Sequence, residues 1–259
     1  MEYAGKVALV TGAVGGIGRA VVHALASAGA SVAAVDLDTA ALTALERNCA
    51  DKGWSVAAFP ADITSPAQVE AAVAAAEERL GPVDHLVNVA GVLRGGPVLE
   101  LGEEDWEHTF AVNTAGVFRM STAVTRRMVE RGRPGSVVTV ASNSAVVPRF
   151  HMAAYAASKA AAVAFTKNLG LELAGHGIRC NAVCPGSTDT PMLRSLWNQE
   201  SDSDGSLNGV AAEYRVGIPL GRFATPDDIA DAVAFLLSDR ASHITMHDLH
   251  VDGGAALGR

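Results

Sequence analysis

The sequence has few aromatic side chains and no long hydrophobic run. Aromatic residues make up 5% of its 259 residues, whereas hydrophobic residues make up 49%. The core must therefore consist mainly of small aliphatic side chains, which suit close packing of helices on a sheet. The length is enough for one domain with a sizeable core. No apolar stretch approaches the roughly 18 residues of a membrane-spanning helix, so we expect no membrane partner.

Cysteine is too scarce for a disulfide framework. The three cysteines are Cys49, Cys180 and Cys184, and an odd count does not suggest paired thiols. The last two lie in an apolar run that we interpret as a buried strand, and two thiols without nearby His or Cys make a poor metal site. His247 and His250 flank a predicted strand at an odd spacing, which directs them to opposite faces. We therefore expect no metal site.

Positive charge is also in deficit. The chain has 20 Lys and Arg against 28 Asp and Glu, a formal net charge of −8. Binding to nucleic acid would need a basic stripe that replaces counterions, so we expect no nucleic-acid partner. The first five residues lead directly into a predicted strand, without the basic and apolar regions of a signal peptide. The expected location is the cytoplasm.

Short β-branched runs alternate with longer Ala-rich stretches along the whole chain. This alternation predicts a single α/β domain, residues 1–259, with a Rossmann-type doubly wound parallel sheet and helices on both faces. The expected strands are Lys6–Thr11, Ser31–Asp36, Ser55–Pro60, Asp84–Asn88, Gly135–Ala141, Ile178–Cys184 and Asp248–Val251. The expected helices are 16–29, 39–51, 66–80, 103–131, 152–174 and 226–238.

Residues 187–217 depart from this rhythm. The middle of the stretch, 200–209, is polar and rich in Gly and Ser. It follows the carboxyl end of a strand, where loops often cover a substrate pocket. We expect a substrate lid, because apolar residues flank the polar part and need something to cover; a disordered surface loop is the alternative.

A glycine-rich turn joins the first strand to the first helix. Such a turn lets the backbone approach a pyrophosphate, and the helix N-terminus supplies N–H groups and partial positive charge. The residues that we assign to it are Gly12, Gly15, Gly16, Ile17 and Gly18.

Asp36 ends the second strand, where a carboxylate can accept hydrogen bonds from the adenosine ribose. The carboxylate would repel a 2′-phosphate, and neither position 15 nor position 37 is basic, since they are Gly15 and Leu37. We therefore expect NAD rather than NADP. Further contacts are expected from Leu37, Asp62, Ile63, Asn88, Ala90 and Gly91. Asp62 could equally cap the helix that starts at Pro66.

Tyr155 and Lys159 are four residues apart in a predicted helix, so their side chains share one face. A neighbouring ammonium favours the phenolate form of a tyrosine, which could then take a proton from a hydroxyl as hydride leaves its carbon. Ser142, at the end of the fifth strand, could hold the same oxygen. Taken alone, such a pair is usually structural; the glycine turn, Asp36 and Ser142 favour catalysis.

The motifs TGAVGGIG, NVAG and YAASK at residues 11–18, 88–91 and 155–159 resemble those of the short-chain dehydrogenase/reductase family over essentially the whole chain. The resemblance implies Tyr155 as base, Lys159 as ribose-binding partner that lowers its pKa, and Ser142 as the residue that orients substrate. It implies Asn113 as holder of a proton-relay water, and contacts to the nicotinamide from Pro185, Gly186 and Thr188. Family members are commonly homotetramers.

Further stretches go beyond the general family pattern, at residues 91–96, 105–113, 146–149, 170–175, 185–190 and 241–245. They resemble a subfamily that oxidises the C3 hydroxyl of 2,3-dihydro-2,3-dihydroxybenzoate in siderophore biosynthesis and so yields an aromatic ring. A dihydroaromatic carboxylate needs a cation, and Arg94 or Arg149 could hold it by paired N–H···O bonds. Either could instead be a surface arginine. The expected apolar wall consists of Met152, Met192, Leu196 and Trp197.

Three alternatives stay open at this point. Asn143, Val146, Val147 and the polar 200–209 stretch depart from that subfamily. These departures could indicate a substrate with an amine at C2, 2,3-dihydro-3-hydroxyanthranilate, from secondary metabolism. A generic oxoacyl-carrier-protein reductase is disfavoured by Asp36, because reductive synthesis usually uses NADPH. A non-catalytic NAD-binding protein is disfavoured by the intact Ser142, Tyr155 and Lys159.

Overall fold

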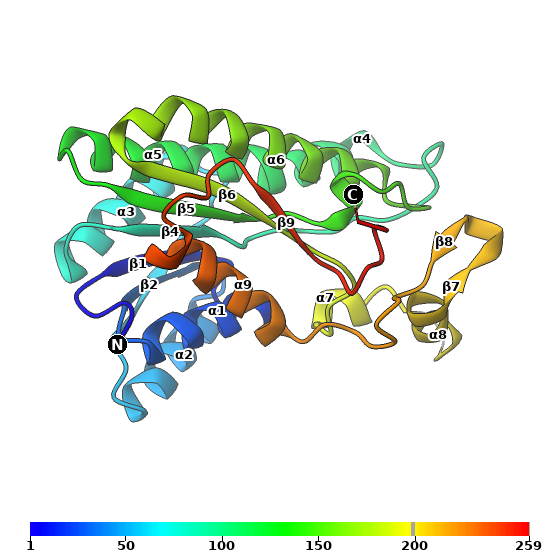
Figure 1. Ribbon diagram of the computed structural model, residues 1–259, viewed down its shortest axis with the longest axis horizontal. Helices are drawn as coiled ribbons and strands as arrows, with labels where there is room; N and C mark the ends of the chain where they lie inside the picture. Colours follow the sequence, from blue (N-terminus) through cyan, green and yellow to red (C-terminus); the bar gives the residue numbers. More distant parts are fainter. Residues whose placement is uncertain (198–199, 259) are drawn as a thin grey trace.

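A parallel sheet forms the centre of the computed structural model, which describes residues 1–197 and 200–258. Within these residues the sheet has seven strands in the order β3-β2-β1-β4-β5-β6-β9, which is the Rossmann arrangement (Figure 1). The strands are β1 (Val7–Thr11), β2 (Ser31–Asp36), β3 (Val56–Pro60), β4 (His85–Asn88), β5 (Gly135–Val140), β6 (Ile178–Pro185) and β9 (Asp248–Val251). Each predicted strand is therefore confirmed, with ends shifted by at most one residue.

Helices cover both faces of the sheet (Figure 1). One face carries α1 (Gly16–Ser27), α2 (Thr39–Asp51) and α9 (Pro226–Leu237), whose apolar residues share one core cluster with β1 and β2. The other carries α3 (Pro66–Leu80), α5 (Val117–Glu130) and α6 (Ala153–Leu173). Burial on both faces explains why the strands read as continuous apolar runs. Among the described residues no helix is both long and apolar enough to cross a bilayer.

The helix that was expected over 103–131 is interrupted. It comprises α4 (Glu103–Phe110), a π-helical turn over Ala111–Gly116 and then α5. Side-chain periodicity did not reveal the turn, because a π-turn inserts about one residue without breaking the rod. Such turns often mark functional sites, and Asn113 lies within this one.

The stretch that was expected to be a lid or a disordered loop has regular structure where it is described. It contains α7 (Pro191–Arg194), α8 (Glu200–Asn208) and a small hairpin of β7 (Gly209–Val210) and β8 (Arg215–Val216). The alternative of a disordered loop is wrong for 200–208, which are helical. In Figure 1 this stretch projects from one end of the molecule, beyond the carboxyl end of β6.

A buried histidine lies at the start of β4, far from this end. His85 is 8% exposed, its Nδ1 lies 2.8 Å from Ser136 Oγ, and its ring packs edge-on against Tyr3. Since Ser136 Oγ donates to Leu237 O, the imidazole donates to Ser136. Burial lowers the pKa of His85 to about 4, and the charge of Asp84 only partly opposes this.

His85 should make the protein less stable in mild acid. The pKa of His85 in the folded protein lies below its unfolded value near ~6.5. The contribution of the neutral imidazole to stability is therefore complete above pH ~6.5 and is lost as the pH falls towards 4. Between pH 7.5 and pH 5, urea titration should show the wild type losing about 2 kcal/mol more of its free energy of unfolding than His85→Gln. Parallel losses in the two proteins would contradict this assignment.

Candidate active site

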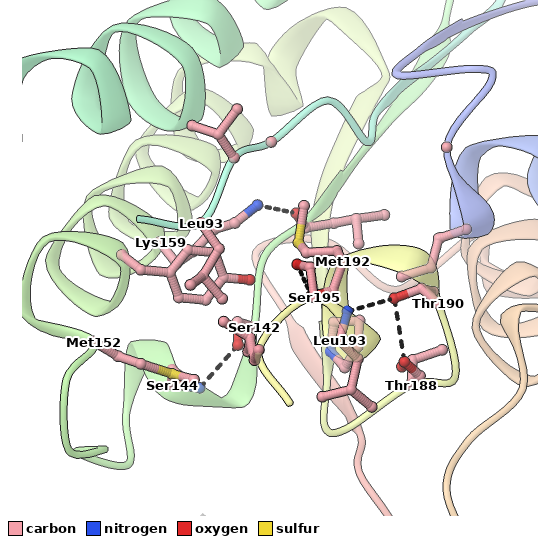
Figure 2. A pocket seen from close by; sticks show the side chains of 18 of the residues that line it. Leu93, Ser142, Ser144, Met152, Lys159, Thr188, Thr190, Met192, Leu193 and Ser195 are labelled. Atoms are coloured by element: carbon pink, nitrogen blue, oxygen red, sulfur yellow. Dashed lines mark hydrogen bonds between the residues drawn. The ribbon is translucent and has the colours of Figure 1, made fainter. Parts of the chain in front are cut away.

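A large cleft lies at the carboxyl ends of the strands, where open α/β sheets bind ligands. Its volume is about 1650 Å³, and its walls run from the glycine turn after β1 to the β7–β8 hairpin. Figure 2 shows part of it, with Ser142 on the β5 side, Lys159 on α6, and the labelled residues Thr188, Thr190, Met192, Leu193 and Ser195 on the opposite wall. Nearly all the predicted site residues line this one cleft; Asn88 and Asn113 do not.

The glycine turn packs so tightly that side chains are excluded from it. A Cβ at Gly18 would lie 1.9 Å from Gly12 O, and one at Gly12, whose φ is +64°, would lie 2.7 Å from Ala90 Cα. Gly15 precedes α1 and provides no side-chain cap, so the first N–H groups of the helix face the cleft. This cradle fits the pyrophosphate of a dinucleotide.

Asp36 is fixed at the rim of this cradle. Its Oδ2 accepts a hydrogen bond from Val14 N at 3.2 Å, and its Oδ1 accepts bonds from Leu37 N and Asp38 N at 2.8 and 3.2 Å. Leu37 is 71% exposed. The carboxylate therefore presents a fixed negative charge at the place where an adenosine ribose would lie.

Asp62 and Ile63 also line the cleft, but Asp62 does not cap α3. Its carboxylate accepts two hydrogen bonds from Thr64, both 2.7 Å long, whereas Ser65 is the N-cap of the helix. The capping alternative is therefore wrong. Ile63 packs against the π-turn, since a Cβ at Gly116 would lie 2.5 Å from Ile63 Cδ1.

Asn88 was expected to contact the cofactor, but it does not line the cleft. Its side chain is buried, and its Nδ2 donates to Ser121 Oγ of α5 at 3.0 Å. Side chains alternate between faces along a strand, and the sequence did not indicate which face Asn88 would join. Ala90 and Gly91, which follow it, do line the cleft.

Ser142, Tyr155 and Lys159 meet in the middle of the cleft. Ser142 follows β5, and the other two side chains lie one turn apart on α6, with Lys159 Nζ 5.8 Å from the Tyr155 ring centroid. Lys159 is 4% exposed, and its ammonium donates to Val140 O at 2.9 Å. Ser142 Oγ accepts from Ser144 N at 3.1 Å. The sheet and α6 thus hold a hydroxyl, a phenol and an amine around one point.

Burial dominates the electrostatics of this group. It raises the pKa of Tyr155, while hydrogen bonding with Ser142 acts in the opposite direction. It also lowers the pKa of Lys159 to about 8. The prediction from sequence considered how the ammonium of Lys159 would lower the pKa of Tyr155, but it did not consider how burial changes the pKa of both groups. A base at Tyr155 therefore needs more positive charge than Lys159 alone supplies.

Asn113 holds the π-turn against the strand end and α6. Its Oδ1 accepts from Val92 N at 2.8 Å, and its Nδ2 donates to Val92 O at 2.9 Å and to Ser158 Oγ at 3.0 Å. The side chain is fully buried. Its hydrogen bonds within the chain make it a positioning residue, and the water relay stays a prediction.

The substrate residues divide into two groups. Arg149, Met152, Met192, Leu196 and Trp197 line the cleft, as do the turn residues Pro185, Gly186 and Thr188. Arg94 also lines the cleft, but at its rim, where the side chain is 55% exposed and 3.8 Å from Asp105. That position agrees with the alternative of a surface ion pair. Val146 and Val147 do not line the cleft, so they do not bear on substrate choice.

Sequence reasoning missed two groups in the cleft. Asn143 donates from Nδ2 to Asp252 Oδ2 at 3.2 Å, which joins the end of β5 to the segment after β9. Arg215, on β8, is also a lining residue. It lies in an irregular polar stretch where no periodicity indicates the direction of a side chain.

With this fold and this site, the comparisons with known proteins identify the family. The family model described as enoyl-(acyl carrier protein) reductase matches residues 12–256, and the chain belongs to the short-chain dehydrogenase/reductase family of oxidoreductases. It is 53% identical to the 2,3-dihydro-2,3-dihydroxybenzoate dehydrogenase of Bacillus subtilis (strain 168), covering 98% of this chain and 97% of that protein. It is 45% identical to the enzyme of the same name from Escherichia coli (strain K12), over the full length of both.

A solved structure supports the same assignment. The 3-ketoacyl-(acyl-carrier-protein) reductase from Brucella melitensis, described as complexed with NADH, superposes with a TM-score of 0.87 at 36% identity. The match covers 98% of this chain and 99% of that one. The family thus uses nicotinamide cofactors, and the glycine cradle described above fits such a cofactor.

Replacing Asn113 with Ala should weaken the fold. The change removes three hydrogen bonds of a buried side chain and leaves the partly buried Val92 backbone groups without these partners, which should cost about 2–3 kcal/mol in urea unfolding. Asn168→Ala on the exposed side of α6 is the matched control, and it should change stability by less than about 0.5 kcal/mol. Equal small losses in both variants would contradict the positioning role.

Proposed function

We propose that this protein is an NAD-dependent dehydrogenase of a cyclohexadiene carboxylate. Its substrate is 2,3-dihydro-2,3-dihydroxybenzoate, which it oxidises at the C3 hydroxyl, and its product is 2,3-dihydroxybenzoate. The observation that carries the proposal is the meeting of Ser142, Tyr155 and Lys159 in the cleft that also contains Asp36. The names of the two bacterial relatives described above support the choice of substrate.

The residues of the chain divide the proton chemistry among them. Ser142 holds the C3 oxygen by a hydrogen bond, and Tyr155 takes the hydroxyl proton. Lys159, as an ammonium, stabilises the phenolate and binds the cofactor ribose. The bound nicotinamide supplies the hydride acceptor and adds positive charge beside Tyr155. Loss of hydride from C3 and of the proton to Tyr155 gives a ketone, which tautomerises to the aromatic product.

Residues 187–217 serve in this proposal as a lid over the substrate. Met192, Leu196, Trp197 and Val210 all face the cleft from this stretch. The ring of Trp197 packs on Phe223 with centroids 5.7 Å apart. These apolar side chains would exclude water from the ring of the substrate.

Two other functions are weaker. An amine at C2 of the substrate is less well supported, because Val146 and Val147 lie outside the cleft and both named bacterial relatives are dihydroxybenzoate dehydrogenases. Cofactor choice alone does not exclude an oxoacyl reductase, since the Brucella reductase is described with NADH. The half-buried Arg149 in the cleft favours a substrate with a carboxylate.

Asp36 should set the preference for NAD over NADP. The wild type should use NAD with a kcat/KM at least about a hundredfold higher, because Asp36 accepts from the ribose and repels a 2′-phosphate. Asp36→Asn removes the charge at nearly constant shape. This variant should lower the ratio of kcat/KM with NAD to kcat/KM with NADP by about tenfold. Steady-state assays with both cofactors measure this. Equal kcat/KM values with NAD and NADP in the wild type would contradict the role of Asp36 in cofactor choice.

A side-by-side assay tests the substrate. NADH formation should be fast with 2,3-dihydro-2,3-dihydroxybenzoate and slow with 2,3-dihydro-3-hydroxyanthranilate. Tyr155→Phe should abolish turnover, by about a thousandfold or more, while NADH binding by fluorescence stays unchanged. Faster turnover of the amine would favour the alternative substrate. Retained turnover in Tyr155→Phe would show that another group is the base.

A further inference from the structure

Two arginines, Arg149 and Arg215, line the same cleft and contact neighbouring segments of its wall. Arg149 lies between the end of β5 and α6, and its Nη2 donates to Ala255 O at 3.5 Å. Arg215 lies on β8 of the 187–217 stretch, and its Nη2 donates to Ser187 Oγ at 3.5 Å. Both side chains line the cleft. The two contacts are long and neutral, so among the residues that the structure describes neither guanidinium has a strong acceptor.

Neither arginine forms an ion pair with a carboxylate of the described residues. Among the side chains that the structure describes, the ion pairs within 4.0 Å include other arginines such as Arg94 and Arg194, but not Arg149 or Arg215. Asp252 and Glu213 are the nearby acids. Asp252 is already bonded to Asn143 and to Gly254 N. Glu213 also lines the cleft but lies beyond ion-pair distance of both arginines.

Burial and proximity both strain the two charges. Loss of water lowers the pKa of Arg149, and the positive charge of Arg215 lowers it further, while Asp252 opposes this. Loss of water also lowers the pKa of Arg215, opposed by Glu213. An arginine stays charged in a protein, and a half-buried charge without a partner is costly. The pair thus forms a site that an anion would stabilise.

We propose that Arg149 and Arg215 together form the carboxylate-binding subsite of the cleft. This inference rests on the proposed function for the identity of the ring, and it adds Arg215 to the residues that determine specificity. A carboxylate has two oxygens that can each accept from a guanidinium, so one anion can join the two arginines. Arg94 is left as a rim residue paired with Asp105.

The pair also connects two different walls of the cleft. Arg149 comes from the segment that precedes α6, whereas Arg215 comes from the hairpin of the lid. A carboxylate held by both would draw the hairpin onto the substrate. A ring without a carboxylate would leave the two positive charges facing each other and would favour an open cleft.

The experiment compares two ring ligands that differ only in the carboxylate. Binding of 2,3-dihydroxybenzoate and of catechol to the NADH-loaded protein is measured by calorimetry. The proteins are the wild type, Arg149→Gln, Arg215→Gln, Arg215→Lys and the double Gln variant. Arg194→Gln is the matched control, because this exposed arginine at the same end of the sheet already pairs with Asp189. NADH binding reports whether each variant is folded.

The wild type should prefer the carboxylate ligand. Each Gln variant should lose about tenfold to a hundredfold of this preference, and the double variant less than the product of the two losses. Arg215→Lys should keep part of it, and Arg194→Gln all of it. In turnover assays Arg215→Gln should raise KM with little change in kcat, because the contact is made equally in ground and transition states.

Arg215 would be excluded from the subsite if Arg215→Gln bound NADH normally and kept the full carboxylate preference. Should that variant not fold, Arg215→Met takes its place, and an unchanged carboxylate preference together with an unchanged KM in Arg215→Met would exclude Arg215 equally. A wild type without any preference for the carboxylate would also overturn the inference. The proposed function fails separately: if the wild type does not oxidise the dihydroxy acid, a preference that depends on both arginines still supports the subsite.

Discussion

The shared carboxyl edge of the parallel strands is the constraint on which the whole site depends. Thr11 pairs with Asn88, Asn88 with Thr139, Val140 with Val183 and Pro185 with Val251. The segments that follow these strands therefore start side by side although they are far apart in the sequence. The glycine turn, Ser142 and Gly186 all occupy this edge, and α6 crosses it with Tyr155 and Lys159.

Sequence reasoning succeeded where a local pattern has one structural solution. Buried parallel strands have to be apolar along their whole length, so their ends could be located within a residue. The glycines at positions 12 and 18 have no room for a Cβ, and the spacing of Tyr155 and Lys159 has one meaning on a helix. The fold and the centre of the candidate site could therefore be predicted from the sequence.

The rest depends on which way a side chain turns and on how much water remains around it. Asn88 turns towards α5, and Arg94 finds Asp105, because of neighbours that are distant in the sequence. Burial of the Tyr155–Lys159 pair opposes the charge separation that the motif requires, and no motif records burial. Arg215 was missed because an irregular hairpin has no period from which its direction could be inferred.

The π-turn over Ala111–Gly116 has a consequence for the long rod of α4 and α5. One added residue rotates everything that follows by about 100° relative to an uninterrupted α-helix. The acidic first turn of α4 and the apolar face of α5 are therefore set independently. The first can face water at the rim of the cleft while the second faces the sheet. The π-turn thus lets α4 keep an acidic, solvent-facing side and lets α5 keep an apolar, sheet-facing side, although the two helices form one continuous rod.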